Sequence, residues 1–96
     1  MENEGYTPNG SAWLAAVDKQ EDDAAEALVA NLTAADEPML LAFLQETDAN
    51  RQWWAIRALG ACGSEASLGA LLPFLKTDHD ELRAVVIMAL GNVGQR

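Results

Sequence analysis

Two consecutive stretches decide the fold: residues 35–65, ADEPMLLAFLQETDANRQWWAIRALGACGSE, and residues 66–96, ASLGALLPFLKTDHDELRAVVIMALGNVGQR. They are equal in length and align without a gap, and ten of the aligned pairs are identical. The identical pairs are apolar residues and glycines, among them Leu40/Leu71, Leu41/Leu72, Phe43/Phe74, Leu44/Leu75, Ile56/Ile87, Ala58/Ala89, Leu59/Leu90, Gly60/Gly91 and Gly63/Gly94. Because a fixed period of about 20–50 residues is the signature of stacked repeats, the sequence predicts a solenoid.

The composition favours helices over strands. The chain has 18 Ala and 13 Leu but only 5 Val and 2 Ile. Ala and Leu lead the helix scale, whereas β-branched residues favour strands. Within each repeat, apolar residues recur at spacings of three and four on either side of a polar turn. We therefore expect an all-α fold, a short right-handed α-solenoid of about three helix pairs.

Capping residues indicate where these helices begin. The acids and proline of residues 36–38 are typical of a first helical turn, and Asn50 is expected to cap the second helix of that repeat. The corresponding signals in the next repeat are Ser64 or Ser67 as a cap, Pro73 as a kink, and Asp80 as the cap of the last helix.

The N-terminal third continues the period weakly. Trp13 falls in register with Leu44, but Val29 and Leu32 stand where the later repeats have glycines. Terminal repeats commonly depart from the pattern. We expect a mobile tail over 1–8 and one domain over 9–96, with repeats at about 9–34 (degenerate), 35–65 and 66–96.

The charge distribution excludes two classes of partner. Net charge is −9, and residues 1–48 hold 11 acids and one base, a net of −10, while residues 49–96 hold 4 acids and 5 bases. Nucleic-acid binding needs a basic groove and an anionic membrane repels acids, so neither is expected. The acidic half favours a basic protein partner. The sequence shows no secretory signal and no apolar stretch of membrane-spanning length, so we expect a cytoplasmic protein.

The third repeat resembles a known family. Residues 71–78, LLPFLKTD, followed by Leu82-Arg83, by Ala89-Leu90-Gly91 and by Gly94, resemble the short HEAT-like repeat named after the phycobiliprotein lyases. The resemblance covers residues 35–96 well and 9–34 poorly. It implies a helical superhelix used for protein binding, and by analogy it admits a bilin lyase-like subunit or accessory.

The resemblance also implies a polar ladder between repeats. In that family an aspartate of the intra-repeat turn pairs with an arginine early in the second helix, and Asp78 and Arg83 stand at these places. The preceding repeat has Thr47 and Gln52 there, with Asp48 and Arg51 nearby as substitutes.

No residue set predicts catalysis, a cofactor or a metal site. His79 is the single histidine, and it lies in an acidic turn of the kind that caps a helix. Cys62 falls on an apolar helix face, where a buried and inert thiol is expected. Glu65 with Asp78 or Asp80 would form a carboxylate pair, but such pairs are weak indicators in a chain with 15 acids. We therefore expect a protein that is not an enzyme.

One line of residues predicts a binding surface. Trp13 and Trp54 align with core positions, whereas Trp53 lies off the apolar stripe, with Arg57 one helical turn later and placed to stack on its ring. Steps of one repeat in either direction extend this pair into a ridge along the second helices: Asp22, Glu26, Trp53, Arg57, Ala84 and Met88. Trp, Arg and Met are enriched at protein interfaces.

The sequence thus favours a non-catalytic scaffold that binds a partner on the concave face of the second helices, with Trp53 as anchor and Arg57 as polar guide. The alternatives are a self-association module such as a homodimer, a fragment of a longer solenoid, and the lyase-like role. The last helix runs to residues 93–96 without a polar capping repeat, which favours self-association or a longer chain.

Overall fold

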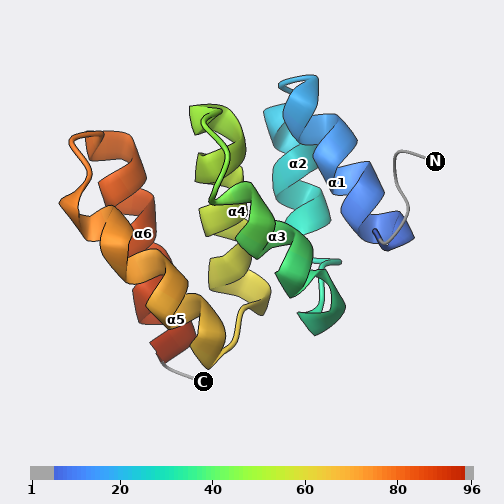
Figure 1. Cartoon of the computed structure of the whole chain (residues 1–96). Coiled ribbons are helices and arrows are strands. Elements are labelled where there is room, and N and C mark those ends of the chain that lie inside the picture. The colour runs from blue at the N-terminus through green and yellow to red at the C-terminus, as the bar shows by residue number, and fades with distance from the viewer. Residues whose placement is uncertain (1–5, 95–96) are drawn as a thin grey trace.

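The computed structural model describes residues 6–94, and within that range every regular element is helical (Figure 1). The order is α1 (Pro8–Asp18), α2 (Asp22–Val29), the 3-10 turn η1 (Ala34–Asp36), α3 (Glu37–Phe43), α4 (Ala49–Cys62), α5 (Glu65–Leu71), the 3-10 turn η2 (Leu72–Lys76) and α6 (Asp80–Gly94). The expected all-α solenoid is confirmed as three helix pairs, α1/α2, α3/α4 and α5/α6. In Figure 1, α2, α4 and α6 form one layer, and α1, α3 and α5 form the other.

The second helix of the first pair is shorter than its counterparts. Helix α2 has 8 residues, against 14 in α4 and 15 in α6. Helix α4 contacts α1 more than it contacts α2. The most extensive contact between any two helices is that of α4 with α6. Consequently α2 covers less of α4 than α6 does.

Side chains from all three pairs form one continuous core. Trp13 and Leu40 are fully buried, and the Trp13 ring stacks on Phe43 with the centroids 6.3 Å apart. Trp54 is 6% exposed, so the predicted core positions of Trp13 and Trp54 are confirmed. The remaining fully buried large side chains are Val17, Ile56, Leu59, Leu71, Val86 and Ser67.

Several expected helix boundaries need correction. The expected tail over residues 1–8 is wrong for its last residues, because Thr7 caps α1, Pro8 begins it, and Tyr6 packs edge-on against Phe43; residues 1–5 lie outside the described range. Asp48 rather than Asn50 caps α4, since its carboxylate accepts hydrogen bonds from the amides of Asn50 and Arg51. Asp80 is the first residue of α6 rather than its cap.

Proline and serine signals in the third repeat act as predicted. Ser64, one of the two expected caps, is the N-cap of α5 and accepts from the Ala66 amide. Pro73 cannot donate a backbone hydrogen bond, and the chain changes there from the α-helix α5 to the 3-10 turn η2.

Polar side chains join the repeats along the edge where the first helices begin. The Thr7 hydroxyl donates to the buried carboxylate of Asp36, at 2.5 Å. One repeat later, the carboxylate of Glu37 accepts from the hydroxyls of Ser64 and of buried Ser67, at 2.8 and 2.6 Å. Burial alone would raise the pKa of Glu37, but the hydrogen bonds from Ser67 and Ser64 outweigh it and lower the pKa below its ordinary value.

The predicted ladder from Asp78 to Arg83 is wrong. Arg83 instead donates to the carbonyl oxygen of Thr77, at 3.0 Å, and to the Asp80 carboxylate, at 2.6 Å. The backbone bond follows the repeat, since Gln52 donates in the same way to the Glu46 carbonyl, one full repeat earlier. These side chains therefore tie the second helix to the preceding turn within one repeat.

Candidate functional site

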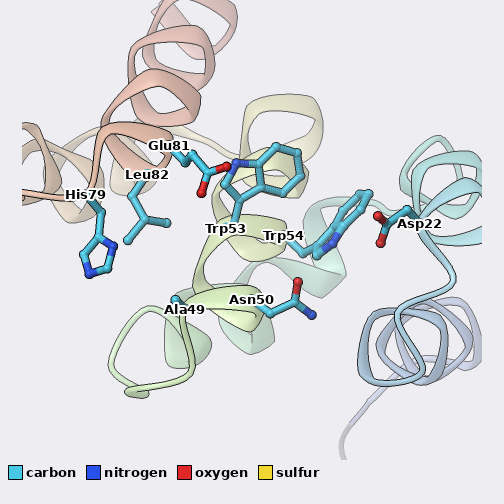
Figure 2. Close-up of a pocket in the computed structure, with 8 residues that line it drawn as sticks. All are labelled: Asp22, Ala49, Asn50, Trp53, Trp54, His79, Glu81 and Leu82. Atoms are coloured by element: carbon cyan, nitrogen blue, oxygen red, sulfur yellow. The ribbon is translucent and has the colours of Figure 1, made fainter.

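The candidate site is a pocket of about 380 Å³ in the layer of second helices (Figure 2). Its lining comes mainly from the N-terminal parts of α2, α4 and α6 and from the turn that precedes α6. Its lining residues are Asp22, Ala49, Asn50, Trp53, Trp54, His79, Glu81 and Leu82. The volume lies at the small end of the range for ligand sites, which suits one side chain better than a large molecule.

Two consecutive tryptophans form the aromatic part of the pocket. The rings of Trp53 and Trp54 meet at 76°, with their centroids 4.9 Å apart. Trp54 is buried and Trp53 is half-buried, so packing fixes the pair while leaving part of its surface open to the pocket. Asn50 holds this end of α4 against α1, because its side-chain amide donates to the Val17 carbonyl at 3.2 Å.

Two carboxylates face the tryptophans from neighbouring helices. Asp22 begins α2 and Glu81 lies in the first turn of α6, and Figure 2 shows Asp22 on the side of Trp54 and Glu81 on the side of Trp53. Both acids are exposed. Among residues 6–94, neither forms an ion pair with a cation of the chain. The pocket therefore combines aromatic surface with unneutralised negative charge.

The structure brings the α2 and α4 residues of the predicted ridge close to one another. Glu26 and Arg57, which occupy equivalent positions of successive repeats, form an ion pair between α2 and α4, so successive second helices do bring these positions together. Asp22 and Trp53 line the same pocket. Arg57 was expected to stack on Trp53, but the structure directs its guanidinium to Glu26.

The α6 part of the ridge lies outside the pocket. Ala84 and Met88 are exposed on α6, Met88 by 52%, but neither lines the cavity. Glu81 and Leu82 contribute instead, one turn nearer the start of the helix. The sequence analysis did not predict Glu81 or Leu82 as site residues. The period of 31 residues could have indicated Glu81, because Glu81 is the repeat equivalent of Asn50, which also lines the pocket.

A second charged cluster borders α4 and has a structural role. The guanidinium of Arg51 makes two hydrogen bonds to Asp18, at 2.9 and 2.7 Å, and donates to both carboxylate oxygens of Glu46, at 3.0 and 3.4 Å. It also lies over the Phe43 ring, 5.4 Å from the centroid. The hydrogen bonds to Asp18 are the largest cause of a raised pKa for Arg51, which fixes its positive charge. Arg51 thus joins the first two repeats, while Asp48 serves only as the cap of α4.

The residues considered for chemistry are scattered. His79 is exposed, and Cys62 is half-buried and packs against the core at the end of α4. Within the described part of the chain, no group of three or more His, Cys, Asp and Glu residues is placed to hold a metal ion. No helix between residues 6 and 94 is both long and apolar enough to cross a membrane.

Comparison with known proteins identifies the repeats. A family profile described as HEAT repeats matches residues 37–96, which is more than half of the chain. No curated protein and no solved structure matches the chain significantly. The match covers α3 to α6, the two pairs that carry the clear repeat period. It identifies HEAT repeats in general and does not single out the lyase-like group.

Proposed function

The chain belongs to the HEAT-repeat family, and we propose that it is a non-catalytic protein-binding module whose partner docks over the pocket of Trp53 and Trp54. HEAT repeats are generally scaffolds for protein interaction. The observation that carries the proposal is the pocket itself, in which a half-buried Trp53 lies beside unpaired carboxylates. Tryptophan is among the residue types enriched where a few side chains dominate the binding energy of an interface.

The proposed contact surface is narrower than the ridge expected from the sequence. Trp53 remains the anchor, but Arg57 is occupied by Glu26, so the polar contacts to the partner fall to Asp22 and Glu81. The acidic N-terminal half of the chain, which includes Asp22, also favours a basic partner.

Site-specific photocrosslinking tests the docking face. A benzoylphenylalanine at position 53 should capture a partner in the source cell, whereas one at Ala42, exposed on α3 in the opposite layer, should not. The captured protein is then purified, and its affinity for the wild type is compared with that of Trp53→Ala, after circular dichroism has shown that the variant folds. A loss of about tenfold or more is expected. Equal binding by the variant would reject Trp53 as the anchor.

A different observation favours a second function, self-association through the outer face of the third repeat. Ile56 of α4 is fully buried, and Gly60 lies against Ala89 of α6. The equivalent positions one repeat later, Ile87 and Gly91, are not covered by any of residues 6–94. Ile87 is 59% exposed, and a Cβ atom added at Gly91 would meet nothing within 4 Å. Leu72 adds a further 53% exposed side chain.

This outer face therefore has the residues of a helix-packing surface, and the occupant we propose is a second copy of the chain. Light scattering after gel filtration should show a dimer that Ile87→Glu converts to a monomer, with Met88→Glu as the control at a neighbouring exposed position. A wild type that stays monomeric at high concentration would reject this function and leave the Trp53 proposal untouched.

A further inference from the structure

The two acids of the pocket, Asp22 and Glu81, have no cation of the described chain beside them, unlike Glu26 of α2. Within the described residues, Arg57 pairs with Glu26, Arg51 with Asp18 and Glu46, and Arg83 with Asp80. These three arginines are thus engaged elsewhere, and Asp22 and Glu81 remain without an internal counter-charge on the wall of a cavity that also exposes indole surface.

The chain already shows which ligand such a set of groups accepts. At Arg51, one guanidinium lies over an aromatic ring, 5.4 Å from the Phe43 centroid, while carboxylates on two sides accept its N–H groups. The pocket offers the same three components, an aromatic surface and two carboxylates from different helices, without an arginine between them.

We propose that the pocket receives the side chain of an arginine from a basic segment of the partner protein. This inference rests on the proposed function and specifies its partner. The guanidinium lies against the indole surface of Trp53 and Trp54 and donates to Asp22 and Glu81. Tryptophan is the best aromatic partner of a cation, and arginine uses it more often than lysine does.

Two physical reasons favour arginine over lysine as the occupant. A guanidinium is planar, so it stacks on a ring while its edge donates two parallel hydrogen bonds to a carboxylate. A lysine ammonium is a compact and strongly hydrated charge, which gains less from a shallow aromatic wall. The pocket, at about 380 Å³, has room for one such side chain.

A titration with small probes tests the inference without knowledge of the partner. The probes are N-acetyl-arginine amide, its neutral isostere N-acetyl-citrulline amide, and the corresponding N-acetyl-lysine amide. NMR monitors the indole N–H signals of Trp53 and Trp54 during each titration. The arginine probe should shift both signals in a saturable manner. The citrulline probe should bind at least about tenfold more weakly, since it lacks the charge that strengthens each hydrogen bond. The lysine probe should also bind measurably more weakly.

Matched variants separate the pocket from the general negative field. Asp22→Asn with Glu81→Gln should weaken arginine binding about tenfold. The control pairs Asp23→Asn with Glu65→Gln. It removes the same charge from exposed first-turn positions outside the lining, and it should leave affinity within about twofold.

Each contrary result has a definite meaning. Absence of saturable shifts, or equal binding of the citrulline or lysine probe, would overturn the arginine assignment, as would equal losses in the pocket and control variants. A purified partner that still depends on Trp53 would then preserve the proposed function while rejecting this occupant. Failure of both experiments would reject the binding face itself.

Discussion

Gly60 and Gly91 offer the sharpest test of how the repeats pack, because the same substitution meets opposite surroundings one repeat apart. A side chain built at Gly60 of α4 places its Cβ 3.1 Å from the Cα and 3.2 Å from the Cβ of Ala89 on α6. Cα belongs to the backbone of a packed helix, so relief requires the two helices to separate. At Gly91 nothing lies within 4 Å.

The magnitudes follow from two opposing terms. Replacing glycine by alanine within a helix favours folding by about 0.5–1 kcal/mol. Overpacking a fitted contact costs about 1–3 kcal/mol. Gly60→Ala should therefore lose about 1 kcal/mol, and Gly91→Ala, near the end of α6, should gain about 0.5 kcal/mol. For a domain of this size, these values correspond to a Tm lowered by about 4–8 °C and raised by about 2–4 °C, respectively.

Thermal unfolding followed by circular dichroism at 222 nm measures both variants against the wild type, with urea titrations to convert the shifts to free energy. Gly91→Ala is the control, because it introduces the same methyl group and the same helix preference without the contact. A Gly60→Ala protein as stable as the wild type would refute close packing of α4 on α6, and a shared direction of change in the two variants would refute the contrast between a covered and a bare face.

Three further predictions concern stability. Ile56→Ala should cost about 2–4 kcal/mol in urea unfolding, whereas Ile87→Ala, at the same position of the exposed repeat, should cost less than about 0.5 kcal/mol; similar losses would show that both faces are covered. Because the folded pKa of Glu37 is depressed, the stability that its carboxylate contributes is present above pH 4.5 and is lost as pH falls through the folded pKa. The Tm deficit of Glu37→Gln should therefore shrink on acidification, and a constant deficit would contradict the hydrogen bonds from Ser64 and Ser67 to the ionised carboxylate. Arg51→Lys should lose about 0.5–1 kcal/mol through its bidentate bond to Asp18, and a double-mutant cycle with Asp18→Asn should return a coupling energy well above zero.

The sequence predicted the fold because the information that fixes it is local and repeated. Apolar spacing, turn residues and glycines recur at a fixed period, so each repeat predicts the next. Boundaries were less predictable. Asp48 and Asn50 are both good cap residues, and only the backbone conformation decides that Asp48 accepts hydrogen bonds from the amides of Asn50 and Arg51. Thr7 caps α1 for the same local reason, in a stretch with too little apolar content to suggest a helix.

The sequence predicted a ridge and not a pocket, because periodicity shows which residues align but not how closely the second helices pack. The step of one repeat correctly brought Asp22 to Trp53 and Glu26 to Arg57. It could not show that α2 is short and makes few contacts with α4. Periodicity also could not show which partner Arg57 contacts, because the Glu26 carboxylate of the preceding repeat and the Trp53 ring of the same helix are both in register with it.

Two sets of carboxylates in this chain have different consequences. Glu37 and Asp36 accept hydrogen bonds from the next or preceding repeat, so they act on stability. Asp22 and Glu81 are exposed and lack a partner within the described residues, so removing their charge costs the fold little. If the proposed function holds, neutralising the first set lowers the Tm and spares binding, whereas neutralising the second spares the Tm and weakens binding. A net charge of −9 therefore does not act as one uniform field, because each carboxylate acts through the groups beside it.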